Sequence, residues 1–207
     1  MKKTLITILV TVLVCCCVVG GTLAWLMDST TTITNTFTVG NVAITLAEPI
    51  ADSDANNAAE FKMIPGTIYA KDPTVTVDAN SENCIVFVKV EETNNKLTSN
   101  ASEKFVIWAM NAGWTLVSGE TNVYYYNAVK SAGDSIQVLA AVSDKTTGGV
   151  TINSNATAAD MEQAETNAPS LAFTAYAIQS DSVFTGNGAI DGTTAATAWG
   201  YIEAANP

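Results

Sequence analysis

The hydrophobic pattern of the chain changes abruptly near residue 24. Residues 4–19, TLITILVTVLVCCCVV, are apolar almost without interruption, whereas the rest of the chain alternates apolar and polar positions in short runs. Alternation with a period of two is typical of β-strands that bury one face. The pattern therefore predicts an apolar N-terminal segment followed by a β-rich domain.

The alternating part of the chain predicts roughly eight to ten short strands separated by Gly, Pro, Asn and Asp turn signals. Strands or strand-like apolar runs are expected at residues 35–46, 74–78, 84–91, 105–110, 114–117, 122–129, 135–143, 150–152 and 170–180. Only residues 157–167, TAADMEQAETN, have a helical pattern, and Pro169 follows their end. No helix or strand is predicted for the Gly-rich C-terminal stretch. The fold class expected for residues 37–207 is all-β, a two-sheet antiparallel sandwich or jelly roll with one short helix.

The strongest strand is CIVFVKVEE, which begins at Cys84. Its alternation places Ile85, Phe87 and Lys89 on one face, and the even-numbered apolar residues from Cys84 on the other. Three further alternations are predicted. Val75 and Val77 share one face, Ile136, Val138 and Val142 are in phase, and Leu171, Phe173, Ala175 and Ala177 share another face.

The N-terminal segment has the layout of a secretory signal peptide at residues 1–24. Lys2 and Lys3 precede the apolar run, and Thr22-Leu23-Ala24 approximates a small-residue cleavage site. The apolar run also approaches the length that spans a membrane, so an uncleaved signal anchor is the alternative. A lipoprotein signal would use Cys15, Cys16 or Cys17, but bulky Val and Leu residues precede them.

Charge and composition narrow the possible partners. Apolar residues make up 48% of the chain and charged residues only 14%; all nine basic residues are lysines. Without Lys2 and Lys3, seven lysines remain against twenty acidic residues, a formal net charge of about −13. Because such a surface repels phosphate backbones, nucleic-acid binding is not expected.

No catalytic site is apparent in the sequence. The chain has no histidine, which excludes the common triads and HExxH zinc sites. Glu91 and Glu92 are adjacent on a strand and should point to opposite faces, as solvated surface residues. Cys84, the only cysteine after residue 24, is expected to be a buried apolar side chain, with a reactive nucleophile as the alternative. The sequence therefore predicts that the protein is not an enzyme and has no cofactor.

Three binding features remain open on the residues alone. Oxygen-bearing side chains alternate at Asp52, Asp54 and Asn56, as in calcium loops, but the glycine of an EF-hand is missing, which favours a solvated loop over a calcium site. Trp108 and Trp114 fit either a sugar platform or core packing. Tyr124-Tyr125-Tyr126 alternates across a strand, with one ring on an exposed face or on a half-buried one.

The boundary GGTLAWLMDSTTTITNTFTVGNVAITL, residues 20–46, resembles the N-terminus of the TasA/camelysin family of exported bacterial proteins. The residues that match the family pattern are Gly20, Gly21, Thr22, Ala24, Leu26, Asp28, Phe37, Gly40, Val42 and Ile44. Weaker similarity covers residues 63–92 and 170–184. Relatives are often described as metallopeptidases, but this chain offers no histidine for zinc, so that activity is not transferred.

The resemblance implies a secreted, jelly-roll-like subunit of an extracellular or biofilm-matrix fibre. It implies cleavage by the signal peptidase SipW between Ala24 and Trp25, at the site formed with Thr22. Residues 25–36 would then form a donor strand that completes the sheet of the next subunit. The residues expected to carry this strand contact are Trp25, Leu26, Asp28, Ile33 and Phe37.

The alternative interpretations of residues 25–36 are an ordinary first strand of a monomer or a disordered tail. The implied partners are other copies of the chain, SipW, and possible matrix proteins or polysaccharide. The alternative function is a monomeric cell-surface adhesin or carbohydrate-binding module.

Overall fold

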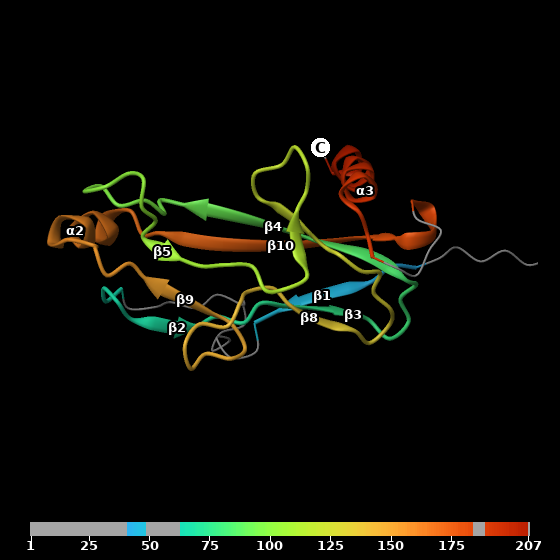
Figure 1. The fold of residues 1–207 in the computed structure, drawn as a ribbon, viewed down its shortest axis with the longest axis horizontal. Helices are drawn as coiled ribbons and strands as arrows, with labels where there is room; N and C mark the ends of the chain where they lie inside the picture. Colours follow the sequence, from blue (N-terminus) through green and yellow to red (C-terminus); the bar gives the residue numbers. More distant parts are fainter. Residues whose placement is uncertain (1–40, 49–62, 184–188, 207) are drawn as a thin grey trace, which may run out of the picture. The chain divides into compact units, whose positions relative to one another are not determined.

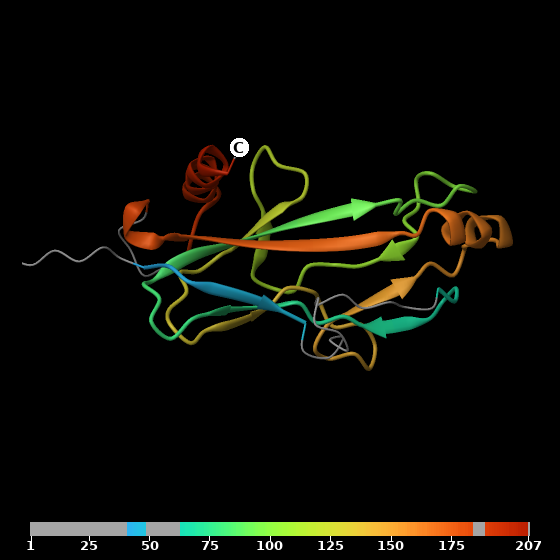
Figure 2. The ribbon, with the colours of Figure 1, turned by 180° about the vertical axis from the view of Figure 1, so that it is seen from behind.

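The computed structural model describes residues 41–48, 63–183 and 189–206 (Figures 1 and 2), all of which belong to one unit, Val39–Pro207. These residues contain ten β-strands, two α-helices and a short 3-10 helix, η1 (Ser180–Ser182). The strands are β1 (Ile44–Ala47), β2 (Ile68–Ala70), β3 (Thr74–Val77), β4 (Cys84–Thr93), β5 (Val106–Ile107), β6 (Trp114–Leu116), β7 (Val123–Tyr126), β8 (Ser135–Gln137), β9 (Gly149–Ile152) and β10 (Ser170–Gln179).

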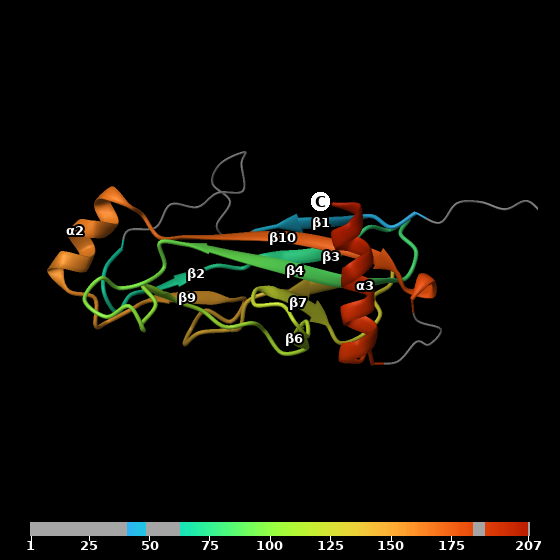
Figure 3. The same ribbon diagram turned by 90° about the horizontal axis from the view of Figure 1, so that it is seen from above.

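The strands form two layers, and these layers contain three sheets in the described part of the chain. The order β10-β4-β7-β6 makes one sheet, and the second layer consists of the sheets β1-β3-β8 and β2-β9-β5. Figures 1 and 3 show β1, β3 and β8 along one half of β4 and β10, and β2 and β9 along the other half. All strand pairs are antiparallel. The expected antiparallel β-sandwich is therefore confirmed, with three sheets among the described residues instead of the predicted two.

Strand β4 is buried on both faces, as its continuous apolar run predicts. Ile85 and Phe87 belong to the core on the outer side of the sheet, while Val86, Val88 and Val90 belong to the core between the layers. Phe87 is completely buried. The predicted assignment of alternate residues to two faces is thus confirmed, and β4 is the central element of the fold.

The alternations predicted for β3 and β10 are also confirmed, and Ile136 and Val138 share one core, but Val142 does not belong to that core. Several strands are shorter than expected. Val75 and Val77 of β3 face the core between the layers, together with Ala175 and Ala177 of β10. In the run expected at 135–143 only β8 is a strand, followed by isolated bridges at Leu139 and Val142, and within residues 105–110 only β5 is a strand. Strand β2 was not predicted, because it has only three residues and a single residue separates it from the Pro65-Gly66 turn.

The helix expected at residues 157–167 is α2 (Ala158–Thr166), with Thr157 and Asn167 as its caps. The Thr157 side chain accepts a hydrogen bond from the Asp160 backbone, and the Asp160 side chain accepts one from the Thr157 backbone. This reciprocal arrangement is a capping box, which satisfies two N–H groups at the start of the helix.

The prediction of a single helix is wrong, because residues of the C-terminal stretch form α3 (Gly192–Ala205). Asp191 caps it by accepting a hydrogen bond of 2.7 Å from the Thr194 backbone. The buried residues of α3 are spaced as one helical stripe: Ala195, Ala198, Trp199 and Ile202. Glycine and three threonines weaken its intrinsic helix propensity, so packing against the sheet supplies the stability that the local sequence lacks.

The α3 stripe covers the outer face of the β4–β10 pair (Figure 3). The Trp199 ring lies 5.6 Å from the Phe87 ring and 5.3 Å from the Tyr176 ring, centre to centre. This helix explains why β4 has to be apolar on its outer face as well as on its inner face.

Cys84 is fully buried at the start of β4, which confirms the expected apolar role. Burial, helped by the negative charge of Asp134, raises the pKa of the Cys84 thiol to about 11.

Because only the thiolate is nucleophilic, native Cys84 is expected to react with iodoacetamide at pH 8 more than about a hundredfold slower than Cys84 of the denatured chain. Mass spectrometry of a chain beginning at Trp25, in which Cys84 is the only cysteine, measures this. Equal native and denatured rates would contradict the burial.

Candidate functional site

The residues of the predicted signal cleavage, donor strand and calcium site lie outside the described residues. They are Thr22, Ala24, Trp25, Leu26, Asp28, Ile33 and Phe37, together with Asp52, Asp54 and Asn56. Their roles stay predictions. Within the described ranges, no group of three or more acidic or cysteine side chains is placed to hold a metal ion.

A long strand edge is the first candidate site. Strand β10, SLAFTAYAIQ, runs ten residues without a charge, a proline or a glycine. Among the described strands its only ladder neighbour is β4, with Thr174 opposite Lys89 and Ala172 opposite Glu91. Alternate residues of an antiparallel strand direct their N–H and C=O groups away from the partner. Such an uncharged edge is a template for pairing with another strand.

Strand β1 lies beside β10 (Figure 3). It is the outer strand of its own sheet and pairs with β3, from Ile44 opposite Val77 to Ala47 opposite Thr74. Ile44 and Leu46 of β1 pack into the same core as Ala175 and Ala177 of β10. The two layers thus bring two edge strands together along one seam of the sandwich, which we call the β1–β10 seam.

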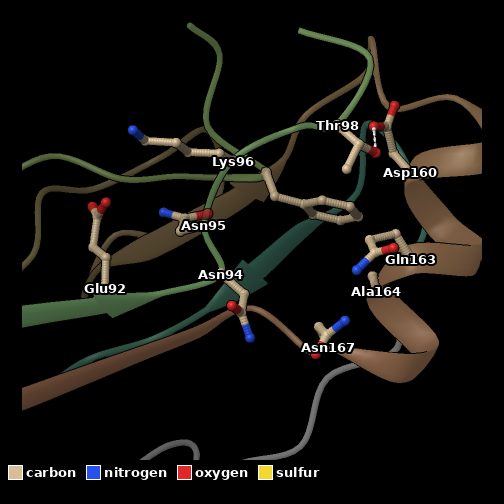
Figure 4. Close-up of a pocket in the computed structure, with 10 residues that line it drawn as sticks. Glu92, Asn94, Asn95, Lys96, Thr98, Asp160, Gln163, Ala164 and Asn167 are labelled. Atoms are coloured by element: carbon tan, nitrogen blue, oxygen red, sulfur yellow. Dashed lines mark hydrogen bonds between the residues drawn. The ribbon is translucent and has the colours of Figure 1, made fainter. Parts of the chain in front are cut away.

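A polar pocket is the second candidate site. It has a volume of about 470 Å³ and lies between the β4–β5 loop and α2 (Figure 4). The pocket is lined by Glu92, Asn94, Asn95, Lys96, Thr98, Phe105, Asp160, Gln163, Ala164 and Asn167. The pairing of β10 with β4 brings the loop and the helix together. Ser170, at the start of β10, lies opposite Thr93 at the end of β4, and only residues 167–169 separate β10 from α2.

Asn95 and Asp160 are buried and fix the walls of the pocket. The Asn95 side chain donates to the Val106 carbonyl (3.0 Å) and accepts from the Val106 N–H (2.6 Å), so it pairs with the backbone as a neighbouring strand would. Asp160 Oδ1 accepts from Thr98 Oγ1 at 2.7 Å and from the Ser99 N–H at 2.8 Å. These bonds attach the β4–β5 loop to the first turn of α2.

The Asp160 carboxylate is satisfied within the fold. Its Oδ2 accepts further hydrogen bonds from the hydroxyls of Ser99 and Thr157 and from the Thr157 backbone. The bonds from Ser99 and Thr157 hold the pKa of Asp160 far below its ordinary value. Asp160 is therefore a charged structural anchor, and its oxygens are not free to bind a ligand.

Three other side chains of the pocket are exposed amides: Asn94, Gln163 and Asn167. In the part of the chain that the structure describes, the side-chain amides of Gln163 and Asn167 have no hydrogen-bond partner, and Asn94 makes only a long bond of 3.5 Å to the Ala168 carbonyl. Asn94 has a φ of 53°, in the left-handed region that asparagine tolerates better than most residues. Figure 4 shows Gln163 and Asn167 on the α2 side of the pocket and Asn94 on the opposite strand end.

The side chains of Trp108 and Trp114, which were candidates for a sugar platform, contact other residues of the domain. Trp108 is half-buried, donates its indole N–H to Glu92 and is covered by the Lys104 ammonium, 4.8 Å from the ring centre. Trp114 is buried and donates to the Gln137 carbonyl at 2.9 Å. Core packing, rather than a sugar platform, therefore accounts for both rings. Glu91 and Glu92 are both exposed, as predicted; Glu91 pairs with Lys89.

The tyrosine triplet alternates across β7 as predicted. Tyr125 is buried on the α3 side, and Tyr124 and Tyr126 are half-buried on the other. The predicted turn before β6 brings Gly113 against the Tyr126 ring, where a Cβ would lie 2.7 Å from a ring carbon, and its φ is +93°. Both constraints require glycine at this turn.

The pocket between the β4–β5 loop and α2 was not predicted from the sequence. Asn94-Asn95-Lys96 directly after the strongest strand marks a turn, and Thr157 with Asp160 has the spacing of a capping box. Neither signal indicates that the turn and the helix meet, because 61 or 62 residues separate Asp160 from Ser99 and Thr98. That proximity follows only from the pairing of β10 with β4.

Comparison with family models, with curated proteins and with solved structures finds no match to this chain. Searched over its described residues, the structure contains no helix with the length and apolarity needed to cross a membrane.

Proposed function

We propose that this protein is a secreted structural subunit of an extracellular or biofilm-matrix fibre, assembled by donation of an N-terminal strand. The observation that carries the proposal is the edge of β10, ten uncharged residues with one ladder neighbour among the described strands. Natural proteins protect such edges with charges, prolines or bulges, and β10 has neither a charge nor a proline. An edge of this kind is suited to pairing with a strand from another copy.

The donor in this proposal is residues 25–36, freed when SipW cleaves after Ala24. The segment contains neither proline nor glycine, and Leu26 and Ile33 supply apolar side chains. Inserted at the β1–β10 seam of the next subunit, it would satisfy backbone groups of the β10 edge and extend a jelly-roll-like sandwich. Because such a head-to-tail contact does not close on itself, repetition produces a filament. No catalytic step is part of this function.

A chain of residues 35–207 is expected to stay monomeric at concentrations at which residues 25–207 form filaments. The deletion removes most of the donor strand but leaves β1 and β10 in place. Electron microscopy and analytical ultracentrifugation across a concentration series measure the difference. Filaments of equal length and number from both chains would refute strand donation.

The acceptor edge is tested by the double substitution Ala172→Lys and Thr174→Glu in residues 25–207. The new lysine lies opposite Glu91 and the new glutamate opposite Lys89, so each cross-strand pair within the subunit is favourable. A charged edge disfavours a further strand, and filament formation is expected to be lost. The matched control is Thr115→Glu on β6, the other edge of the same sheet, which should assemble normally.

The alternative function is a monomeric adhesin or carbohydrate-binding module, which the amide-lined pocket favours. Monodisperse particles of residues 25–207 at every concentration would support that function over the fibre subunit.

A further inference from the structure

We propose that the pocket between the β4–β5 loop and α2 binds an uncharged N-acetylated sugar unit of an extracellular glycan. The chemistry of the ligand is inferred from the pocket, and its extracellular source rests on the proposed secretion; neither depends on whether the chain forms fibres.

The pocket has the size and rigidity of a binding site for a small ligand. Its volume of about 470 Å³ lies in the range of about 300–1,000 Å³ typical of small-molecule sites. Its loop wall is held by two buried side chains, Asn95 toward Val106 and Asp160 toward Thr98 and Ser99. A wall fixed before binding reduces the entropy lost when a ligand binds.

The side chains that remain available are neutral and bear both donors and acceptors. Asn94, Gln163 and Asn167 each offer an amide N–H₂ and a carbonyl oxygen. A sugar hydroxyl both donates and accepts, and an acetamido group presents one N–H and one C=O. Amide side chains complement both groups without requiring a charge on the ligand.

The charged groups of the pocket are engaged with the protein or lie at its rim. Asp160 is saturated by hydrogen bonds, and Glu92 accepts from Lys104 and from the Trp108 indole. Figure 4 shows the Lys96 side chain directed away from Asp160, Gln163 and Asn167. The group of amides therefore favours a neutral ligand over an anion or a metal ion.

An apolar wall beside the amides favours the acetyl group. Phe105 and Ala164 line the pocket at the surface of the core cluster beneath it, where only small parts of their side chains are exposed (2% and 3%). An acetamido methyl placed against Phe105 and Ala164 would lose its contact with water while its N–H and C=O reach Gln163 or Asn167. A simple hexose has hydroxyls but no methyl group to use this wall.

Saturation-transfer difference NMR of the complete 207-residue chain, in a detergent without sugar groups, tests the proposal. The probes are N-acetylglucosamine, N-acetylgalactosamine, glucose and glucuronic acid. At least one N-acetylated probe is expected to receive saturation, most strongly at its acetyl methyl, and to exceed glucose and glucuronic acid. No transfer to either N-acetylated probe, or a stronger signal from glucose or glucuronic acid, would overturn it.

The double variant Gln163→Ala/Asn167→Ala is expected to weaken binding by about tenfold or more, because it removes two hydrogen-bonding side chains. Both side chains are exposed and have no partner among the described residues, so the fold should be retained. The matched control, Glu162→Ala/Thr166→Ala, changes two exposed α2 positions that do not line the pocket and should bind normally. Asn94→Gly removes the third amide and tolerates the positive φ; it should also weaken binding. Unchanged binding in both amide variants would place the sugar elsewhere.

Discussion

Replacing Phe87 with alanine is expected to lower the free energy of unfolding by about 3–5 kcal/mol, the usual cost of removing a buried phenylalanine. Phe87 is completely buried in the middle of β4, and its ring contacts Trp199 of α3. The substitution would leave a cavity between the sheet and the helix and weaken the attachment of α3. Because single domains are stable by only about 5–15 kcal/mol, much of the total stability would be lost.

Urea denaturation followed by tryptophan fluorescence measures this loss, because Trp199 in the α3 contact and the chain's other tryptophans change environment on unfolding. Ile107→Ala is the matched control, because Ile107 is a large apolar residue of β5 that is 46% exposed. It should change the free energy of unfolding by less than about 0.5 kcal/mol. Similar losses in the two variants would mean that Phe87 is not part of a packed core.

Asp160→Asn is expected to destabilise the domain at neutral pH and to flatten its acid-denaturation profile. The two Asp160 oxygens accept hydrogen bonds from Thr98, Ser99 and Thr157, and an amide nitrogen in place of one oxygen would face donors. The unfolding temperature at pH 7 should fall by more than about 5 °C, as for other losses of a buried polar network.

The pH dependence follows from the lowered pKa of Asp160 in the folded chain. A depressed folded pKa gives stability that is complete above the unfolded value of about 3.9 and is lost as pH falls from there toward the folded value. The difference between the parent chain and Asp160→Asn should therefore be constant above about pH 5 and shrink below about pH 4. Thermal unfolding from pH 2 to pH 8 measures it, with Glu165→Gln on the exposed side of α2 as the control. A difference that does not change with pH would contradict the role given to the carboxylate.

The strongest local patterns in the sequence were sufficient for several elements. Strand β4 was predicted with the correct distribution of Ile85 and Phe87 to one face and Val86 and Val88 to the other. Helix α2 was predicted at 157–167 from its helical pattern and from Pro169 after its end, because such signals act within a few residues of a helix end; the structure shows that Thr157 and Asn167 are its caps. Burial of Cys84 followed from the same apolar run.

Other elements depend on contacts between distant residues, and local patterns did not predict them. Helix α3 has three threonines and two glycines that favour other conformations locally, and the surface it covers, at Phe87 and Tyr176, lies far away in sequence. The division of the second layer into two sheets depends on which strands meet, β9 with β2 and β5, and alternation within one strand does not encode its partner.

By itself, the sequence determined that this is an acidic, β-rich chain with a central strand apolar on both faces and a short helix near residue 160, because alternation, propensity and helix-stop signals are local properties. Only the tertiary structure decided the number of sheets, the helix α3, the β1–β10 seam and the amide-lined pocket. The pocket and the seam exist because antiparallel pairing aligns β10 with β4 and brings side chains from distant parts of the chain together. Such proximity depends on the free energy of packing the whole domain, which no single segment contains.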